Sequence, residues 1–467
     1  MHAPPAVPFV RSPLPWLGHG IAFGKDADAL LQRLRARHGD AFTLLLGGKR
    51  MTFLLNPHDA PAFFKQSKTL VAGPISKEIS GKAFGIDWSQ YAVDVHEVQV
   101  PFDKSMRKSV IGPMTLHMQE KAAARLQALG RHHWQSGELF RFVAKLVFDA
   151  GGEAMLGDGL FDDPALFEEF LHFDKRFPLL VSGLPRQIFF RRAERFLQKL
   201  SLHLQSPRPG QAPVMDTRFD TLKDVTSVRE IGRNNAGLFW ATQANTVVMA
   251  FYAVFFILRD AEARRQILAE LDAVAGSVQQ QPTLTLDQLD QLEKLDACLD
   301  EVLRLKTSPM PIRVATQPVT LPLYSGRECR LNTGDIVCLF PRLTHMDPMI
   351  YPQPELFIWD RFLQRQGPNQ FSYRGEPLKY NLLPFGGGQS ICPGRHFARS
   401  EFKILTALLL RQFDIELLDS AIPPHDKSRA GLGALTPLQD VPFRFRLREP
   451  ATHAWQGSHP LVSTLEG

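Results

Sequence analysis

A long uncharged segment, residues 234–258, is the strongest constraint on how this chain folds. It runs without a charge from Arg233 to Arg259 and is long enough to span a bilayer. A helix that is apolar on all sides is equally typical of the centre of a large core. The first half of the segment carries amide and hydroxyl side chains, which disfavours a membrane. We therefore predict a buried central helix and no membrane span, with a span as the alternative.

The remaining pattern predicts a mainly α chain with small β-sheets at both ends. Helical apolar spacing recurs in 118–134, 260–276 and 396–413, and Thr285 with Gln288 forms a capping-box signature. Short β-like runs lie at 41–47, 50–56, 319–324, 335–340 and 441–447, and the first two form a hairpin around Gly47-Gly48. No linker divides the chain, so we expect one domain over 1–467, with a proline-rich arm at 1–20.

Charge and cysteine content exclude several classes of protein. The net charge is +6, without a block of five basic residues, so we expect no nucleic-acid partner. The four cysteines are too few for a disulfide framework and too widely spaced for a CxxC metal site; they are Cys298, Cys329, Cys338 and Cys392. The N-terminus lacks the pattern of a secretory signal or anchor. We therefore expect a soluble, cytoplasmic protein.

The segment from Phe385 to Gly394 predicts a reactive or metal-binding thiolate. Three consecutive glycines allow close approach to a flat or bulky group, and Cys392 stands at the mouth of the last helix. A helix N-terminus stabilises a thiolate, which is a nucleophile or a metal ligand. A soft thiolate without neighbouring ligands suits an iron whose other ligands come from a porphyrin. A glycine-rich helix start with a buried structural cysteine is the alternative.

The same segment resembles the haem-binding signature of the cytochrome P-450 superfamily, Phe-x-x-Gly-x-Arg/His-x-Cys-x-Gly. Phe385, Gly388, Cys392 and Gly394 match, whereas Ser390 replaces the basic residue that contacts a haem propionate. The resemblance implies haem b as cofactor, with Cys392 as axial ligand of its iron. It leaves the propionate to another cation, for which Arg313 is our candidate.

Further motifs carry the same resemblance and imply the family's fold. Glu301-x-x-Arg304 resembles its ExxR motif, and residues 354–362, PELFIWDRF, resemble the later loop that supplies Arg361. In the family these three side chains form a buried structural network; an exposed surface ion pair is the alternative. The implied fold is a triangular prism in which the haem lies between the central helix and the helix after Cys392. The haem-binding core would span about 230–450.

Residues 242–246, TQANT, align with the oxygen-side signature of the family's central helix, Ala/Gly-Gly-x-Asp/Glu-Thr. The resemblance implies that Thr246 lies over the iron. Asn245 replaces the usual acid and cannot titrate, so a proton relay would need water, Thr246 or another route. The alternative for Thr246 is a hydroxyl that bonds back to its own helix turn.

The helix sequence Trp-Ala-x-Gln-x-Asn, Ser390 and residues 428–440 resemble one branch, that of the sterol 7α- and 12α-hydroxylases and prostacyclin synthase. Retained Thr246 favours oxygenation. We therefore expect a soluble, bacterial monooxygenase that hydroxylates a sterol, terpenoid or fatty-acid-derived lipid with dioxygen and two electrons. The alternatives are an isomerase or dehydratase that converts a lipid peroxide without a reductase, and a haem sensor or carrier without turnover.

The resemblance also places the substrate and the electron donor. Candidate pocket residues are Trp240, Ala244, Pro309, Met310, Leu435 and Thr436, with 75–84 as a lid; ordinary core packing is the alternative. A ferredoxin or flavodoxin, supplied by its reductase, would dock on a basic face beside the cysteine. Arg395, Arg399, Lys403, Lys104, Arg107 and Lys108 could form that face, or could belong to an ordinary solvated surface.

Overall fold

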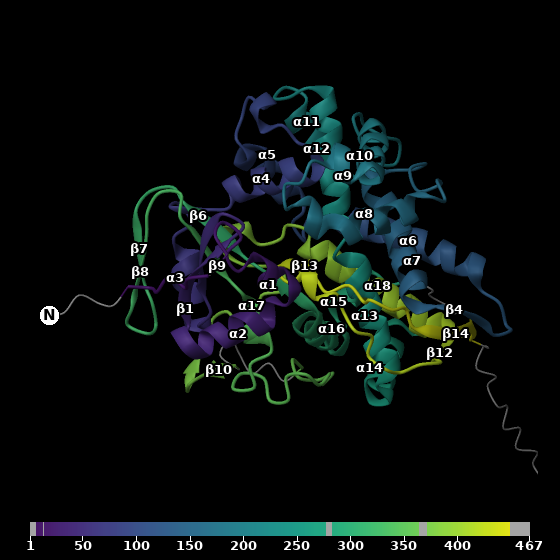
Figure 1. Cartoon of the computed structure of the whole chain (residues 1–467). Helices are drawn as coiled ribbons and strands as arrows, with labels where there is room; N and C mark the ends of the chain where they lie inside the picture. The colour runs from purple at the N-terminus through teal and green to yellow at the C-terminus, as the bar shows by residue number, and fades with distance from the viewer. Residues whose placement is uncertain (1–5, 13, 277–282, 364–370, 449–467) are drawn as a thin grey trace, which may run out of the picture.

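The structure is a computed structural model, and it describes residues 6–12, 14–276, 283–363 and 371–448. Most of the described chain is helical, as the sequence predicts (Figure 1). The α-helices are α1 (Gly20–Lys25), α2 (Ala27–His38), α3 (Ala60–Lys65), α4 (Gly73–Phe84), α5 (Val95–Ser105), α6 (Gly112–Leu129), α7 (Leu139–Leu156), α8 (Leu166–Leu180), α9 (Arg186–Phe189), α10 (Arg191–His203), α11 (Pro213–Leu222), α12 (Val228–Gln243), α13 (Thr246–Arg259), α14 (Ala261–Ala275), α15 (Leu286–Asp290), α16 (Glu293–Lys306), α17 (Pro341–His345) and α18 (Arg395–Gln412). Short 3₁₀ helices are η1 (Pro57–Asp59), η2 (Trp88–Gln90), η3 (Gly388–Ser390) and η4 (Lys427–Arg429).

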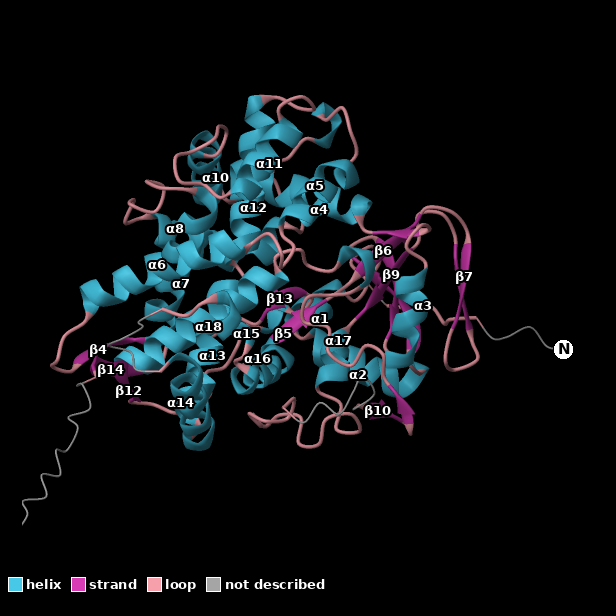
Figure 2. Ribbon diagram, turned by 180° about the vertical axis from the view of Figure 1, so that it is seen from behind, coloured by secondary structure: helices cyan, strands magenta, loops and turns pink. Residues whose placement is uncertain are grey.

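The strands form small sheets, the two largest at opposite ends of the molecule (Figure 2). They are β1 (Ala41–Leu46), β2 (Lys49–Leu54), β3 (Leu70–Val71), β4 (Gln135–Glu138), β5 (Thr307–Pro309), β6 (Ile312–Ala315), β7 (Val319–Pro322), β8 (Glu328–Leu331), β9 (Ile336–Leu339), β10 (Ser372–Tyr373), β11 (Glu376–Pro377), β12 (Phe413–Leu417), β13 (Leu432–Ala434) and β14 (Pro442–Leu447). The five-stranded sheet has the order β1-β2-β9-β6-β3 and contains the predicted hairpin. The three-stranded sheet has the order β12-β14-β4.

The N-terminal arm runs along the first sheet. The N–H group of Val10 donates to the carbonyl of Thr43 at 2.9 Å, and the N–H group of Thr43 donates to the carbonyl of Pro8 at 2.8 Å. Residues 1–5 and 13 of the predicted arm lie outside the described residues. The expectation of one domain over 1–467 stays a prediction.

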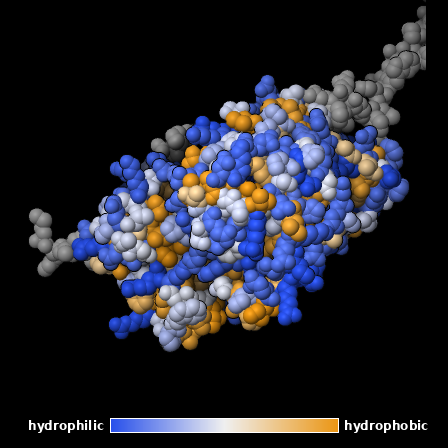
Figure 3. Space-filling view, turned by 90° about the horizontal axis from the view of Figure 1, so that it is seen from above, coloured by the Kyte–Doolittle hydropathy of each residue, from blue (hydrophilic) through white to orange (hydrophobic). Residues whose placement is uncertain are grey.

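The uncharged segment forms α12 and α13, which together cross the centre of the molecule. Every residue from Thr246 to Ile257 is buried. The combined helix is long and apolar enough to cross a membrane, but 78% of its most apolar stretch is buried inside the protein. On the face in Figure 3, hydrophobic residues form small groups among hydrophilic ones. The buried central helix that the sequence predicts is therefore present.

The hydrogen-bonded helix is interrupted between α12 and α13, at Ala244 and Asn245, although both residues keep right-handed helical dihedral angles. The side-chain oxygen of Asn245 accepts a hydrogen bond from the N–H group of Ala434 in β13 at 2.8 Å. Gly433 has a φ of +124°, and a Cβ atom there would stand 2.2 Å from this oxygen. Glycine at 433 thus allows β13 to lie against the junction of the two helices.

Glu301, Arg304 and Arg361 form one buried network. Two nitrogens of Arg304 donate to the two carboxylate oxygens of Glu301, each at 2.7 Å, and neither side chain is exposed. Nε of Arg361 donates to the same oxygens at 3.0 and 3.1 Å. The structure therefore has the buried arrangement and not the exposed ion pair.

The network continues toward the loop that carries Cys392. Arg304 donates to the carbonyl of His345 at 2.7 Å, and Nε2 of His345 accepts from the N–H group of Leu383 at 3.0 Å. Burial, and then the charges of Arg342 and Arg304, lower the pKa of His345 to about 3. His345 therefore stays neutral at ordinary pH and keeps its acceptor nitrogen for the loop.

We expect Glu301→Gln to lower the free energy of unfolding by about 3–5 kcal/mol, because it leaves two buried guanidinium groups without a counter-charge. Urea unfolding of the haem-loaded protein measures this change. The matched control is Glu262→Gln, which breaks an exposed pair with Arg265 on α14 and should leave the unfolding midpoint unchanged. Equal effects of the two substitutions would contradict a structural role for the network.

Candidate active site

The loop before α18 is held by a backbone bond and by close packing on α3. The N–H group of Cys392 donates to the carbonyl of Phe385 at 2.9 Å. Gly388 has a φ of +65°, and a Cβ atom there would stand 2.8 Å from Phe64. A Cβ atom on Gly387 would approach the same ring as closely. One flat group that the glycines approach is therefore a phenylalanine ring of the protein itself.

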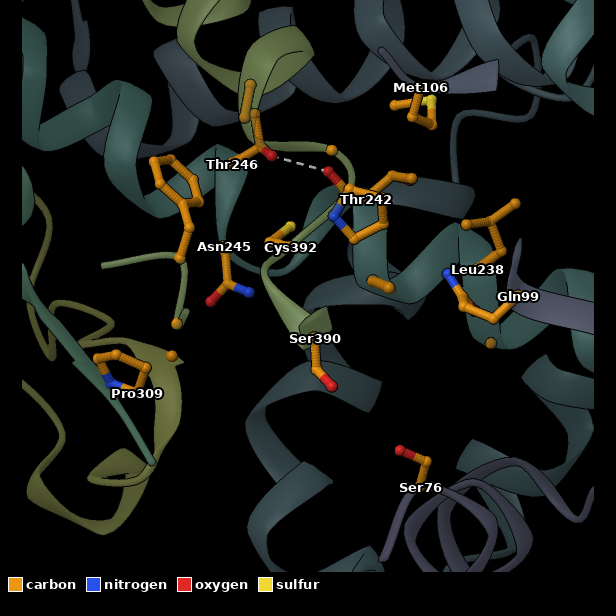
Figure 4. Close-up of a pocket in the computed structure, with 18 of the residues that line it drawn as sticks. Ser76, Gln99, Met106, Leu238, Thr242, Asn245, Thr246, Pro309, Ser390 and Cys392 are labelled. Atoms are coloured by element: carbon orange, nitrogen blue, oxygen red, sulfur yellow. Dashed lines mark hydrogen bonds between the residues drawn. The ribbon is translucent and has the colours of Figure 1, made fainter. Parts of the chain in front are cut away.

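Cys392 differs from the other cysteines in its surroundings. Cys298, Cys329 and Cys338 are buried, whereas the side chain of Cys392 is exposed to a deep internal cavity (Figure 4). Burial raises the pKa of its thiol, and the N–H group of Gly394 and the charge of Arg395 only partly offset this effect. The N-terminus of α18 thus favours the thiolate, while burial opposes it more strongly. A bound cation would favour the thiolate further.

The cavity has a volume of about 580 Å³ and is largely apolar. It lies between α4, α5, α12, α13, α18, the cysteine loop, the segment around β5 and β6, and the strand β13. Eight of the residues singled out from the sequence line it: Asn245, Thr246, Pro309, Met310, Arg313, Phe385, Cys392 and Gly394. The structure thus brings the predicted oxygen-side helix and the predicted cysteine loop to one space.

Four predicted pocket residues do not line this cavity, and Gly388 also lies outside its wall. The face of α12 and α13 that lines it has helical spacing and comprises Asn234, Gly237, Leu238, Ala241, Thr242, Asn245, Thr246 and Met249. Trp240 and Ala244 are rotated away from this face. Trp240 donates to Asp174 at 2.9 Å and stacks on Phe177. Leu435 and Thr436 follow the strand that reaches the cavity, β13, and Leu435 donates its N–H group to the carbonyl of Lys306.

The predicted lid, 75–84, falls entirely on α4. Ser76, Ser80 and Phe84 of this helix line the cavity. The ring of Phe84 also packs against Trp240, with 5.7 Å between the ring centroids. The helix covers one side of the cavity; its movement as a lid stays a prediction.

Thr246 and Asn245 both make hydrogen bonds within the protein. The hydroxyl of Thr246 donates to the carbonyl of Thr242 at 2.8 Å, as the dashed line in Figure 4 shows. This is the back-bonded arrangement that the sequence left as the alternative, and Thr246 lines the cavity all the same. Its oxygen keeps lone pairs for a ligand, but its proton is committed to the helix. The oxygen of Asn245 is occupied by Ala434.

Arg313 provides a test of whether the site fits the expected haem. Its side chain is 8% exposed, lines the cavity, and lies over the ring of Phe63. It donates one hydrogen bond, to the carbonyl of Ile312, and forms no ion pair with any described residue. A buried guanidinium without a counter-charge is costly and suits an anionic group such as a propionate. A thiol and an unpaired cation on the same cavity wall therefore fit a haem.

Glu401, a buried carboxyl on α18, is a cavity residue that no sequence motif predicts. It lines the cavity and has no hydrogen-bond or ion-pair partner among the described residues. Burial raises the pKa of Glu401 well above its usual value, which favours the protonated form. A Cβ atom on Gly151 would stand 2.0 Å from its oxygen, so the facing helix α7 needs glycine there.

The basic face beside the cysteine is largely neutralised by acidic residues. Arg399 pairs with Asp296 and Asp300, and Lys403 pairs with Asp296. Lys108 pairs with Asp290 in the same way. Arg395, Lys104 and Arg107 form no ion pair with any described residue, and Arg395 donates to the carbonyl of Cys392. A face built from all six cations is therefore weaker in net charge than the sequence suggested.

Comparisons with known proteins agree with this site. The family model described as "Cytochrome P450" matches residues 185–443. The human 7-alpha-hydroxycholest-4-en-3-one 12-alpha-hydroxylase is 32% identical, over 94% of this chain and 93% of that enzyme. Mouse cytochrome P450 7B1 is 33% identical, over 94% and 90% of the two chains. Cholesterol 7-alpha-monooxygenase from Cricetulus griseus is 30% identical, over 94% and 93%.

The solved structure of a retinoic acid-bound cyanobacterial CYP120A1 has the same fold, with a TM-score of 0.74. It is 22% identical and covers 96% of this chain and 100% of its own. The family match and these relatives confirm the fold class and the resemblance to the sterol hydroxylase branch. The chain belongs to the cytochrome P450 family and is a haem-dependent monooxygenase.

Proposed function

We propose that this enzyme hydroxylates a sterol or a sterol-like lipid. One observation carries the proposal: Cys392 and Thr246 face a single, largely apolar cavity. The human relative is a 7-alpha-hydroxycholest-4-en-3-one 12-alpha-hydroxylase and the Cricetulus griseus relative is a cholesterol 7-alpha-monooxygenase. Each matches 94% of this chain, which favours a sterol over a terpenoid or a fatty-acid derivative. We further propose haem b as the cofactor, and a ferredoxin or flavodoxin with its reductase as the source of two electrons.

When bound, the haem supplies the activation of dioxygen and the transfer of one oxygen atom to a C–H bond. We propose that Cys392 holds the iron through its sulfur atom. Arg313, whose guanidinium has no carboxylate partner among the described residues, would hold a propionate in place of the missing basic residue at Ser390. These two contacts would hold the cofactor in the cavity.

The cavity wall gives the substrate its position. Phe84 from α4, Val98 from α5 and Leu238 from α12 are apolar side chains on that wall. They exclude water from the reacting C–H bond and bind the body of a rigid apolar molecule without directional contacts. Directional contacts must then come from the few polar groups in the cavity.

Proton supply on the oxygen side falls to Thr246, because Asn245 cannot titrate and is tied to β13. The hydroxyl of Thr246 donates to Thr242, so its oxygen acts as a hydrogen-bond acceptor toward the cavity. We propose that Thr246 positions a water molecule, and that this water carries the proton.

We expect Thr246→Ala to lower the yield of product per electron consumed and to raise the release of hydrogen peroxide. The reason is that the water that carries the proton loses the Thr246 oxygen as its hydrogen-bond acceptor, which slows proton delivery. Thr246→Ser is the matched control, because it keeps the hydroxyl and should stay close to wild type. Full coupling in Thr246→Ala, measured as product against reductant and peroxide, would show that Thr246 has no part in proton delivery.

A second function, isomerisation or dehydration of a lipid peroxide, is favoured by one observation. The oxygen of Asn245 accepts from Ala434 and the hydroxyl of Thr246 donates to Thr242, so neither side chain is free to supply a proton. An isomerase would not need a proton from this helix. Such an enzyme would convert a lipid hydroperoxide without dioxygen and without an electron donor.

The test begins with titration of the purified ferric enzyme with cholesterol, a terpenoid and a long-chain fatty acid, observed in the haem Soret band. We expect the high-spin shift with the sterol, since displacement of water from iron requires a guest that fills the cavity. We then expect hydroxylated product only when dioxygen and an electron donor are both present. Product from a lipid hydroperoxide in the absence of both would overturn the hydroxylase in favour of the isomerase. Ligand binding without any product would favour a sensor or carrier.

We also propose that the enzyme is soluble and cytoplasmic. The burial of α12 and α13 in the protein core supports this proposal, because the most apolar helix of the chain is already covered by protein. Fractionation of cells that express the full chain would test it, with the enzyme expected in the soluble fraction.

A further inference from the structure

Arg218, on α11, is a second buried cation that lines the cavity. Its side chain is 7% exposed. Nε donates to the side-chain oxygen of Asn235 at 2.8 Å, and Nη2 donates to the side-chain oxygen of Asn234. The guanidinium lies over the ring of Phe102, 5.2 Å from its centroid. Two amides and a ring thus hold the group in one orientation.

The amides that hold Arg218 are themselves held. The NH₂ group of Asn234 donates to the hydroxyl of Tyr91 at 3.0 Å, and that of Asn235 donates to the carbonyl of Leu204 at 3.0 Å. Both amide oxygens are therefore fixed toward Arg218. The arrangement is preorganised, and it leaves Nη1 without a hydrogen-bond partner among the described residues.

Arg218 has no carboxylate partner in the described part of the chain. Glu230, the acid on the adjacent turn of α12, accepts from the N–H group of Asp87 at 2.9 Å and lies 3.8 Å from Arg233. Glu401 lines the same cavity but forms no ion pair with Arg218, and burial raises the pKa of its carboxyl with no nearby cation to offset the rise. Burial lowers the pKa of Arg218 to about 10, which still leaves it charged at neutral pH. A buried positive charge without a counter-charge is costly to the folded state.

The haem does not supply the counter-charge for Arg218. Arg218 contacts Asn234, at one end of the lining face of α12 and α13, whereas Thr246 lies twelve residues further along. At the α-helical rise of 1.5 Å per residue this separation is about 18 Å. Arg313 and Ser390 border both this cavity and the neighbouring space beneath the cysteine loop, whereas Arg218 borders only the former. Arg218 therefore stands at the end of the cavity away from Cys392.

We propose that Arg218 binds the anionic head group of the substrate, and that the substrate is a lipid carboxylic acid. Its apolar body would lie along the wall formed by Leu238 and Val98, with the reacting carbon near Thr246. This inference rests on the proposed function and narrows it, from a bulky apolar lipid to one with a negative charge at its far end. A carboxylate would accept a hydrogen bond from Nη1, which has no partner among the described residues, and would supply the missing counter-charge.

The wild-type holoenzyme provides the first test. Cholanic acid, a steroid with a side-chain carboxylate, and its methyl ester are titrated while the Soret band is followed, and palmitic acid and methyl palmitate form a second pair. We expect the acid of at least one pair to bind about tenfold or more tightly than its ester, as a charged hydrogen bond would provide. The steroid pair and the fatty-acid pair distinguish the two sources of the carboxylate.

Two variants assign the preference to Arg218. We expect Arg218→Gln to reduce the ratio of ester to acid dissociation constants to near one, and Arg218→Lys to keep most of it. Arg192→Gln, at an exposed arginine on α10, is the control and should keep the wild-type ratio. If Arg218→Gln does not fold, the wild-type acid and ester titrations and Arg218→Lys still decide the question.

The outcomes separate this inference from the function on which it rests. Equal affinity of acid and ester within both pairs overturns the anion site, and leaves the sterol hydroxylase intact if the steroid pair binds. An acid preference confined to the palmitate pair supports the anion site and excludes a sterol as the substrate. An acid preference that survives Arg218→Gln removes Arg218 from the site. Absence of any shift with all four ligands overturns the anion site, and the cholesterol titration then decides the sterol hydroxylase on its own.

Discussion

The carboxylate of Glu301 is the group on which the rest of the site depends. It is fully buried and forms ion pairs with two guanidinium groups, from α16 and from the loop that precedes the cysteine segment. The same Arg304 is bonded to the carbonyl of His345, and the neutral ring of His345 accepts from the backbone just before Phe385. A chain of hydrogen bonds therefore leads from a buried ion pair to the loop that presents Cys392. Because none of these groups can exchange its partner for water, the loop has a single low-energy position.

The cavity is marked by buried ionisable side chains that have no ion-pair partner among the described residues. Its wall is largely apolar, yet it contains two arginines without carboxylate partners in the described chain and one carboxyl without a cation. Arg313 lines the cavity together with the cysteine loop, and Arg218 on α11 contacts the N-terminal half of α12. Burial of a cation without a counter-charge costs free energy, and a bound anion would offset that cost. We propose that each cation marks a place where the loaded enzyme holds negative charge.

Motifs with a local physical cause could be read from the sequence, and contacts between distant segments could not. The uncharged segment had to be buried somewhere, and the capping box of Thr285 and Gln288 is present in α15. The face of α12 that lines the cavity was not predictable, because the helix is apolar on most sides and its rotation is set by packing. This is why Trp240 was placed in the pocket although its indole is bonded to Asp174. The neutralisation of Arg399 by Asp296 and Asp300, and the isolation of Arg218, likewise depend on helices that meet only in the folded chain.

The central claim is that the thiolate of Cys392 holds the haem iron in the cavity that Thr246 also lines. The most direct measurement is the absorption spectrum of the reduced, carbon monoxide-bound enzyme, compared between wild type and Cys392→Ser. If Cys392 is the ligand, we expect the red-shifted Soret band of a thiolate-ligated haem in the wild type and its loss in Cys392→Ser. A thiolate-type spectrum that persists in Cys392→Ser would contradict the account, because the iron would then be held by another sulfur.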